Sequence, residues 1–180
     1  MISLLKVTIS GPPGSGTSTL VSRLSKERKW NYLNGGEIFR SAAFERNITI
    51  EEFSALCKND LDVDRSLDNT LKEIMTSPDS PEIIESRLCG WWAQELKLDC
   101  IKIWISASDI ERAKRIQNRE GGGFDVCLEK TRKRQKDDMD RYKTLYNINL
   151  DDLSPYDLVV EADDKNEDDV FQIVNNYLGG

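Results

Sequence analysis

Gly11-Pro-Pro-Gly-Ser-Gly-Thr-Ser18 is the stretch that decides the fold of this chain of 180 residues. Its three glycines allow backbone N–H groups to converge on phosphate oxygens, and the helix expected after it points the positive end of its dipole at the same place. The stretch follows a largely apolar segment, Leu4–Ile9, with the character of a strand, and helical periodicity then runs to about Arg28. A strand, a glycine-rich loop and a helix in this order predict a phosphate-binding loop, and hence a protein that binds a nucleoside triphosphate.

One residue of the loop departs from the pattern Gly-x4-Gly-Lys-Ser/Thr. Thr17 stands where lysine is expected, and a threonine hydroxyl cannot supply the positive charge that lysine gives to the β- and γ-phosphates. Ser18 occupies the position whose hydroxyl binds Mg²⁺. Two functional alternatives stay open: an active enzyme in which other cations replace this charge, and a nucleotide-binding protein without catalysis. The strand–loop–helix context argues against a third reading, a glycine-rich turn with no ligand.

The composition excludes several classes of function. The chain has no histidine, which excludes a Ser-His-Asp or Cys-His catalytic unit and a histidine-ligated metal. Its four cysteines lack the paired spacing of metal ligands, and a domain of this size needs no disulfides, so we expect reduced thiols in a cytoplasmic protein. The net charge of −7 argues against a nucleic-acid partner. Apolar runs are too short to cross a membrane, and the first strand leaves no room for a signal peptide.

Strands and helices alternate along the chain. Beyond the first strand we expect strands at 30–33, 81–85, 100–105 and 157–161, and helices at 109–119, 128–146 and 168–178. Gly35-Gly36 is expected to end the strand at 30–33 before consecutive helices between residues 37 and 75, one of which begins with a capping box at Thr49-Ile-Glu-Glu52. This order predicts an α/β fold, the three-layer sandwich of P-loop NTPases with a five-stranded parallel sheet.

Charged residues after the third strand fit the needs of phosphoryl transfer. Glu85 ends this strand beside the loop, where an acid can hold the shell of Mg²⁺; an ordinary strand-end carboxylate is the alternative. Arg87 lies two residues further on, so strand alternation points it the same way, where it can clamp an acceptor phosphate.

Arginines cluster on two expected helices on either side of Gly121-Gly-Gly123. On the first helix, three arginines recur at helical spacing: Arg112, Arg115 and Arg119. We expect them to line one side of the site just before this glycine hinge. On the next helix another set shares one face: Arg134, Asp138 and Arg141. A solvated charged face accounts for any single arginine equally well. Taken together, and on an acidic chain, they favour a lid that closes on a small anionic ligand.

The ordered set of motifs resembles the nucleoside monophosphate kinases, most closely the cytidylate kinases of the archaeal type. The loop alone is shared by a vast superfamily, but the set is specific and covers nearly the whole chain. Its members are Gly-Pro-Pro-Gly-Ser-Gly-Thr-Ser-Thr at 11–19, Gly36-Glu-Ile-Phe-Arg40, Glu85-Ser-Arg-Leu-Cys-Gly-Trp91, Glu111-Arg-Ala-Lys-Arg-Ile116, Arg141-Tyr-Lys143, Tyr146-Asn-Ile148 and Ser154-Pro-Tyr-Asp157.

The resemblance implies transfer of a phosphoryl group from ATP to CMP, with dCMP also accepted and with Mg²⁺ as cofactor. We expect a cytoplasmic monomer whose partners are these small-molecule nucleotides, with no nucleic acid and no membrane. Residues 1–180 would form a single P-loop kinase domain with a core of 1–36, 77–118 and 147–180. A helical monophosphate-binding insertion would occupy residues 37–76, and a short lid residues 119–146.

The loop motif and the resemblance together assign roles to individual residues. ATP would be bound by Gly11, Pro12, Pro13, Gly14, Ser15, Gly16, Thr17, Ser18 and Thr19, and Mg²⁺ by Ser18 and Glu85. The acceptor would be bound by Arg40, Arg87, Asp138 and Arg141. The catalytic cations would be Arg87, Arg115, Arg119, Arg134 and Arg141. Besides Thr17, two positions depart from the family and bear on base preference, Ser86 in place of glycine and Gln135 in place of the aspartate of bacterial relatives.

Several alternatives stay open. The chain could be a kinase for UMP or AMP, or a nucleotide-binding or assembly protein without turnover, for which the acceptor-side arginines would have no use. Asp60, Asp64 and Asp68 recur at every fourth residue, and we expect a solvated acidic helix face, with selection of cytosine as the alternative. For Trp91 and Trp92 we expect packing of a helix in preference to stacking on a base.

Overall fold

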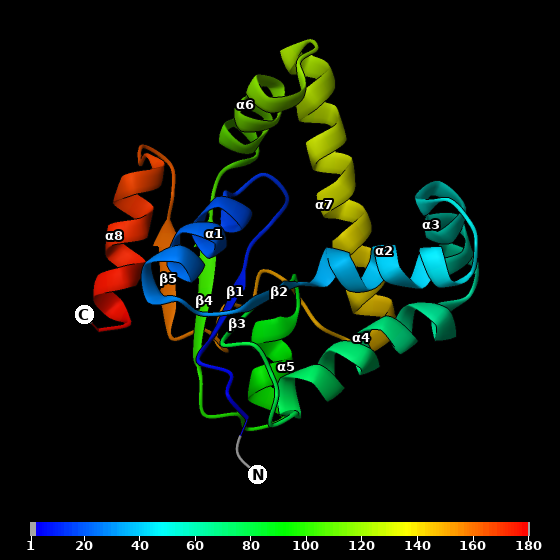
Figure 1. Cartoon of the computed structure of the whole chain (residues 1–180). Coiled ribbons are helices and arrows are strands. Elements are labelled where there is room, and N and C mark those ends of the chain that lie inside the picture. Colours follow the sequence, from blue (N-terminus) through cyan, green and yellow to red (C-terminus); the bar gives the residue numbers. More distant parts are fainter. Residues whose placement is uncertain (1–2, 180) are drawn as a thin grey trace.

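A computed structural model of the chain describes residues 3–179. Its sheet consists of five parallel strands in the order β2-β3-β1-β4-β5 (Figure 1). The strands are β1 (Val7–Ser10), β2 (Tyr32–Asn34), β3 (Ile83–Glu85), β4 (Ile101–Ser106) and β5 (Leu158–Glu161). The predicted five-stranded parallel sheet is therefore confirmed. In the register of the sheet, Ile9 of β1 and Asn34 of β2 both lie opposite Glu85.

Helices cover both faces of this sheet, which makes three layers. In chain order they are α1 (Thr17–Arg28), α2 (Gly35–Glu45), α3 (Ile50–Asn59), α4 (Leu61–Thr76), α5 (Cys89–Glu95), α6 (Asp109–Glu120), α7 (Phe124–Tyr146) and α8 (Glu167–Tyr177). One core cluster packs α1 and α8 against the sheet, and a second packs α5 and parts of α4 and α7 against its other face. Burial on both faces explains why β1 has no exposed residue.

Trp92 belongs to the second of these cores. Its side chain is buried, and its ring meets Tyr146 edge-on with the ring centroids 4.9 Å apart. Trp91 packs against the same cluster. Both tryptophans therefore have the packing role expected from the sequence.

Two helical units extend from the sheet (Figure 1). The expected insertion, 37–76, falls in α2, α3 and α4, which share a small apolar core around Ala43, Phe53 and Cys57. The expected lid, 119–146, covers the end of α6 and all of α7, and these two helices pack around Ala113, Ile116 and Cys127. The lower part of α7 runs down toward α4 (Figure 1), so that residues of both helical units face the same space.

Two expected element boundaries are wrong for physical reasons. The strand ends before Gly35-Gly36 as expected, but α2 begins at Gly35 and not at Glu37, because the Asn34 side chain caps its first turn by accepting a hydrogen bond from the Gly36 N–H. The helix expected from residue 128 begins at Phe124, since Phe124 and Leu128 both pack against α6. The capping box that begins α3 with Thr49 and Glu52 is confirmed.

Candidate active site

The loop from Gly11 to Ser18 connects β1 to α1 and needs its glycines. Gly14 and Gly16 have φ angles of 80° and 91°, a region that other residues rarely adopt. At Gly11 a Cβ atom would lie 2.7 Å from the carbonyl oxygen of Ile105, so no side chain fits. The first N–H groups of α1 have no carbonyl partner within the helix, and they lie where the loop ends. This arrangement suits an anion such as a triphosphate.

Thr17 points to an acidic side chain on β3. Its Oγ1 donates a hydrogen bond of 2.6 Å to Glu85 Oε1, and Ser18 Oγ donates to the same oxygen at 3.3 Å. The second oxygen, Oε2, accepts from Asn34 Nδ2 at 2.9 Å. Thr17 and Glu85 are both buried. The residue that replaces lysine therefore holds a carboxylate in place at the base of the loop.

A main cleft of about 480 Å³ opens beside this loop. Its walls come from the loop, the first turns of α2, one side of α4, the end of β3 and the two helices α6 and α7. Ten residues assigned to the site from sequence line it: Pro12, Pro13, Gly14, Thr17, Ser18, Glu85, Arg87, Arg119, Arg134 and Arg141. The volume is in the range of small-molecule and cofactor sites.

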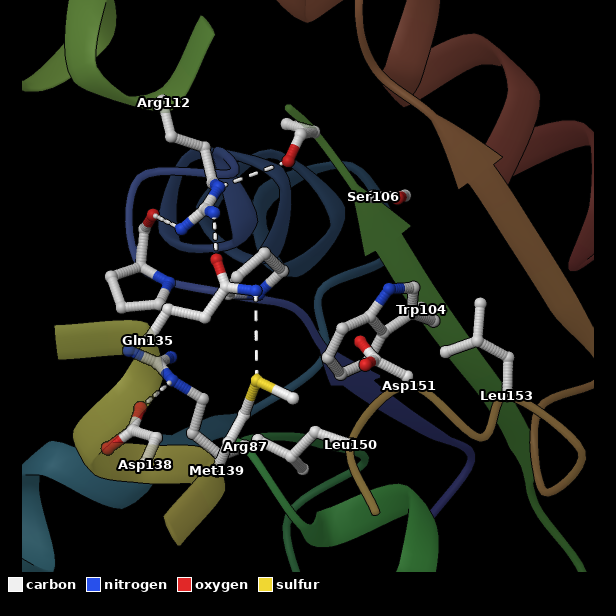
Figure 2. Close-up of a pocket in the computed structure, with 13 residues that line it drawn as sticks. Arg87, Trp104, Ser106, Arg112, Gln135, Asp138, Met139, Leu150, Asp151 and Leu153 are labelled. Carbon is white, nitrogen blue, oxygen red and sulfur yellow. Dashed lines mark hydrogen bonds and ion pairs between the residues drawn. The ribbon is translucent and has the colours of Figure 1, made fainter. Parts of the chain in front are cut away.

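A chain of opposite charges leads from the loop across the cleft. Arg87 donates from Nη1 to the carbonyl oxygen of Gly11 at 3.1 Å. Its Nε donates to Asp138 Oδ2 at 3.1 Å (Figure 2). Arg141 Nη2 lies 3.4 Å from Asp138 Oδ1, and Arg141 Nε lies 3.4 Å from Asp64 Oδ2. Asp138 of α7 thus brings together Arg87 and Arg141, which were both predicted to bind the acceptor.

The acidic residues of α4 correct one expectation from the sequence. Asp64 and Asp68 do not form a solvated face, since both line the main cleft and Asp64 is only 7% exposed. Asp68 Oδ2 accepts a hydrogen bond from the Tyr146 hydroxyl. Burial raises the pKa of both carboxyls, while Arg141 acts in the opposite direction on each. Asp60 behaves differently, because it caps α4 by accepting from the N–H of Asp62.

A second expectation from the sequence was also wrong: the three arginines of α6 do not line one side of a lid. α6 begins against the loop, so its arginine-bearing face straddles the loop. Arg112 is buried and donates to Ala107 O, Pro13 O and Gln135 Oε1, so that it supports the loop from one side (Figure 2). Burial lowers the pKa of this guanidinium. Together with Arg87 and Asp138, it lines a small cavity of about 150 Å³.

Arg115 lies on the other side of the loop. It donates from Nη1 to Ser15 O at 2.9 Å and from Nη2 to Ala162 O at 3.1 Å. There it borders a hollow of about 240 Å³ that also includes Gly16 and Thr19. Of the three arginines of α6, only Arg119 borders the main cleft, with its side chain largely exposed.

Arg40, which was also predicted to bind the acceptor, is not among the residues that line the main cleft. It lies exposed on α2, and its guanidinium approaches Gly36, which itself lines the main cleft. Its assigned contact with the acceptor phosphate stays a prediction.

Sequence reasoning missed the contribution of Asn34 and Tyr146. Asn34 bonds both Glu85 and the first turn of α2, and Tyr146 bonds Asp68. An asparagine between a strand and a Gly-Gly pair was an available signal for the first, because such residues cap helices. No local pattern pointed to the second, since the partners are 78 residues apart.

Two further findings concern metal binding and membrane-spanning helices. Within residues 3–179, no group of three or more acidic or cysteine side chains is placed to hold a metal ion by itself. No helix in that part of the chain has the length and apolarity required to span a membrane.

Comparisons with known proteins agree with this geometry. A family model described as an AAA domain matches residues 7–142. A cytidylate kinase from Methanococcus maripaludis is 39% identical over 174 residues, which is 96% of each chain. One from Methanosarcina mazei is 43% identical over 164 residues, 91% of this chain and 90% of that protein.

Solved structures agree on the fold alone. Shikimate kinase from Bacteroides thetaiotaomicron superimposes with a TM-score of 0.62 over 97% of this chain and 98% of that one, at 11% identity. With a phosphate-binding loop, a five-stranded parallel sheet in this order and relatives matched over nearly their full length, the chain belongs to the cytidylate kinase family of P-loop proteins.

Proposed function

We propose that this protein transfers the γ-phosphoryl group of ATP to CMP, forming ADP and CDP, and that it also accepts dCMP. The observation that carries the proposal is the pair of arginines, Arg87 and Arg141, that line the same cleft as the phosphate-binding loop and are joined by Asp138. A protein that only binds ATP has no use for cations on this acceptor side. The names of the archaeal relatives support CMP as the acceptor over UMP and AMP.

The chemistry required of the side chains is positioning and charge stabilisation. The acceptor is an ionised phosphate, so no general base is needed, and the backbone N–H groups of the loop hold the donor. Arg119 and Arg134 line the same cleft as Thr17 and Ser18. We propose that these arginines, together with Arg87, supply the positive charge that Thr17 lacks.

The residues at the base of the loop fit a Mg²⁺ ion. Glu85 and the hydroxyls of Thr17 and Ser18 present hard oxygen atoms close together, and Mg²⁺ is commonly held by one or two carboxylates together with substrate phosphates. Ser18 and Glu85 would hold this ion, which would supply positive charge against the phosphates of ATP.

We also propose that α6 and α7 close over the bound nucleotides. Closure excludes water, which would otherwise hydrolyse ATP. Gly121 and Gly122 have φ angles of 79° and 92°, and at neither glycine nor at Gly123 does another atom lie within 4 Å of a Cβ position. These residues therefore have the freedom that the tip of a lid needs.

We infer a cytoplasmic monomer, in keeping with four free cysteines and with small-molecule substrates. Size-exclusion chromatography with light scattering, together with cell fractionation, tests this inference.

The decisive experiment measures ADP release from MgATP with CMP, dCMP, UMP, AMP and GMP in turn. We expect release that depends on the acceptor, highest with CMP. Absence of acceptor-dependent release with all five would contradict the kinase proposal, and release with UMP or AMP alone would move the chain to another acceptor. Arg87→Ala should raise the KM for CMP and lower kcat, whereas Arg65→Ala, which removes an exposed arginine paired with Asp62 within α4, serves as the matched control.

A further inference from the structure

The main cleft is polarised along its length. At the loop end it carries the cation Arg87, which donates to the carbonyl oxygen of Gly11. At the opposite end, apolar side chains of α2 and α4, among them Phe39 and Leu67, stand beside the carboxyl groups of Asp64 and Asp68. A carboxylate repels a phosphate, so the phosphate of an acceptor nucleotide belongs at the loop end. Its base then reaches the apolar and acidic end.

Asp64 is incompletely paired at this end of the cleft. Its Oδ2 atom is buried and accepts no hydrogen bond, and its side chain is only 10% exposed. Arg141 Nε, 3.4 Å away, is likewise buried and without a hydrogen-bond partner. Burying such atoms without hydrogen bonds is costly, and the residue lines the space that a ligand fills.

A series of polar contacts connects the phosphate-binding loop to Asp64. From Gly11 it passes through Arg87, Asp138 and Arg141 to Asp64. Asp64 is the last member and is therefore separated from the loop by two arginines. Asp68, one helical turn further along α4, has one oxygen engaged by Tyr146. Asp64 is thus the acidic residue best placed for a hydrogen-bond donor on the base.

The two pyrimidines differ in what they offer at position 4. Cytosine carries an amino group that donates hydrogen bonds, whereas uracil carries a carbonyl oxygen that only accepts them. A carboxylate oxygen accepts from the first and is repelled by the second. The ion pair with Arg141 favours the charged carboxylate, which is the form that discriminates.

We propose that Asp64 determines the base specificity of this protein by accepting a hydrogen bond from the 4-amino group of cytosine. The proposal rests on the proposed function, because it assumes that a pyrimidine monophosphate is the acceptor. The apolar side chains of α2 and α4 hold the flat faces of the ring, and Arg141 orients the carboxylate.

The test compares Asp64→Asn with the wild-type protein. An amide can either accept or donate, so the variant tolerates both bases. We expect kcat/KM for CMP to fall by about ten- to hundredfold, the range for a hydrogen bond to a charged group, while kcat/KM for UMP falls less or rises. The matched control is Asp62→Asn, on the exposed side of the same helix, which should leave the CMP/UMP ratio unchanged.

A binding experiment without turnover isolates the contact. Calorimetry should give the affinities of CMP and of the ribonucleotide of pyrimidin-2-one, which lacks any group at position 4. Wild-type protein should prefer CMP by tenfold or more, and this preference should disappear in Asp64→Asn. Melting temperature and ATP affinity, measured in parallel, report whether the variant is folded.

Each outcome decides the matter. If Asp64→Asn lowers the activities with CMP and UMP equally, the residue acts on the sugar or only on Arg141, and the proposal is overturned. An unchanged preference for CMP over the pyrimidin-2-one ribonucleotide in the variant overturns it as well. Failure of the proposed function looks different, because the wild-type protein would then show no release of ADP dependent on CMP.

Discussion

Thr17 Oγ1 lies 2.6 Å from Glu85 Oε1 and donates a hydrogen bond to it, from the loop position where lysine is expected. The loop residue therefore points at the sheet and not at the phosphates. Thr17 belongs to a polar network in which Glu85 also accepts hydrogen bonds from Ser18 and Asn34.

Thr17→Val tests the role of this hydrogen bond. Valine keeps the shape of threonine but removes the donor, so we expect the free energy of unfolding to fall by about 1.5–3 kcal/mol. The apparent affinity for MgATP should fall with it, because Glu85 loses one of its restraints. Thr17→Ser keeps the donor and is the control. Chemical denaturation and the dependence of the rate on MgATP measure both effects, and equal behaviour of the two variants would contradict the role.

Glu85→Gln tests the metal-binding assignment. The amide keeps the size of the side chain but is a poor ligand for Mg²⁺, so the Mg²⁺ concentration for half-maximal rate should rise by about tenfold or more, with little change in the KM for CMP. Glu82→Gln is the matched control, since Glu82 lies near the other end of β3 and accepts from the N–H of Asn31. An unchanged Mg²⁺ dependence in Glu85→Gln would remove this residue from the metal site.

Asp138→Asn tests whether this residue positions the acceptor-side arginines. Asp138 pairs with Arg87 at 3.1 Å and with Arg141 at 3.4 Å. Removing its charge should raise the KM for CMP by about tenfold, which corresponds to about 1.4 kcal/mol, without changing the affinity for ATP. Asp140→Asn, an exposed partner of Lys136, is the control. If the effects of Asp138→Asn and Arg87→Ala are additive in the double variant, the two side chains do not act together.

Asp68→Asn should alter the pH dependence of stability. Burial raises the pKa of Asp68 above its ordinary value of 3.8, although the hydrogen bond from Tyr146 opposes this. The stability contributed by the neutral carboxyl is therefore complete below 3.8 and is lost as the pH rises through the raised pKa. The amide stays neutral, so the variant should gain stability relative to the wild type between acid and neutral pH. Denaturant unfolding at several pH values measures this, with Asp62→Asn as the exposed control, and parallel pH profiles for wild type and variant would contradict it.

Much of the fold was predictable because its signals are local. The loop from Gly11 to Ser18 needs a particular backbone at Gly14 and Gly16, and apolar runs of strand length alternate with helical patterns around it. The capping box at Thr49 and the position of Glu85 at the end of β3 follow from residues only a few places apart. Errors were confined to boundaries such as the start of α7, where packing on α6 extends the helix.

What only the tertiary structure decided is the pairing of charges. Asp64 and Arg141 are 77 residues apart in the sequence, and a row of acids on one helix reads equally well as a solvated face until α7 is placed beside it. The same holds for the direction of Thr17 and for the arginines of α6, which support the loop from two sides. The sequence by itself determined a phosphate-binding fold, because backbone geometry and apolar periodicity are properties of short segments. Which charged groups meet depends on how distant helices pack, and no short segment contains that information.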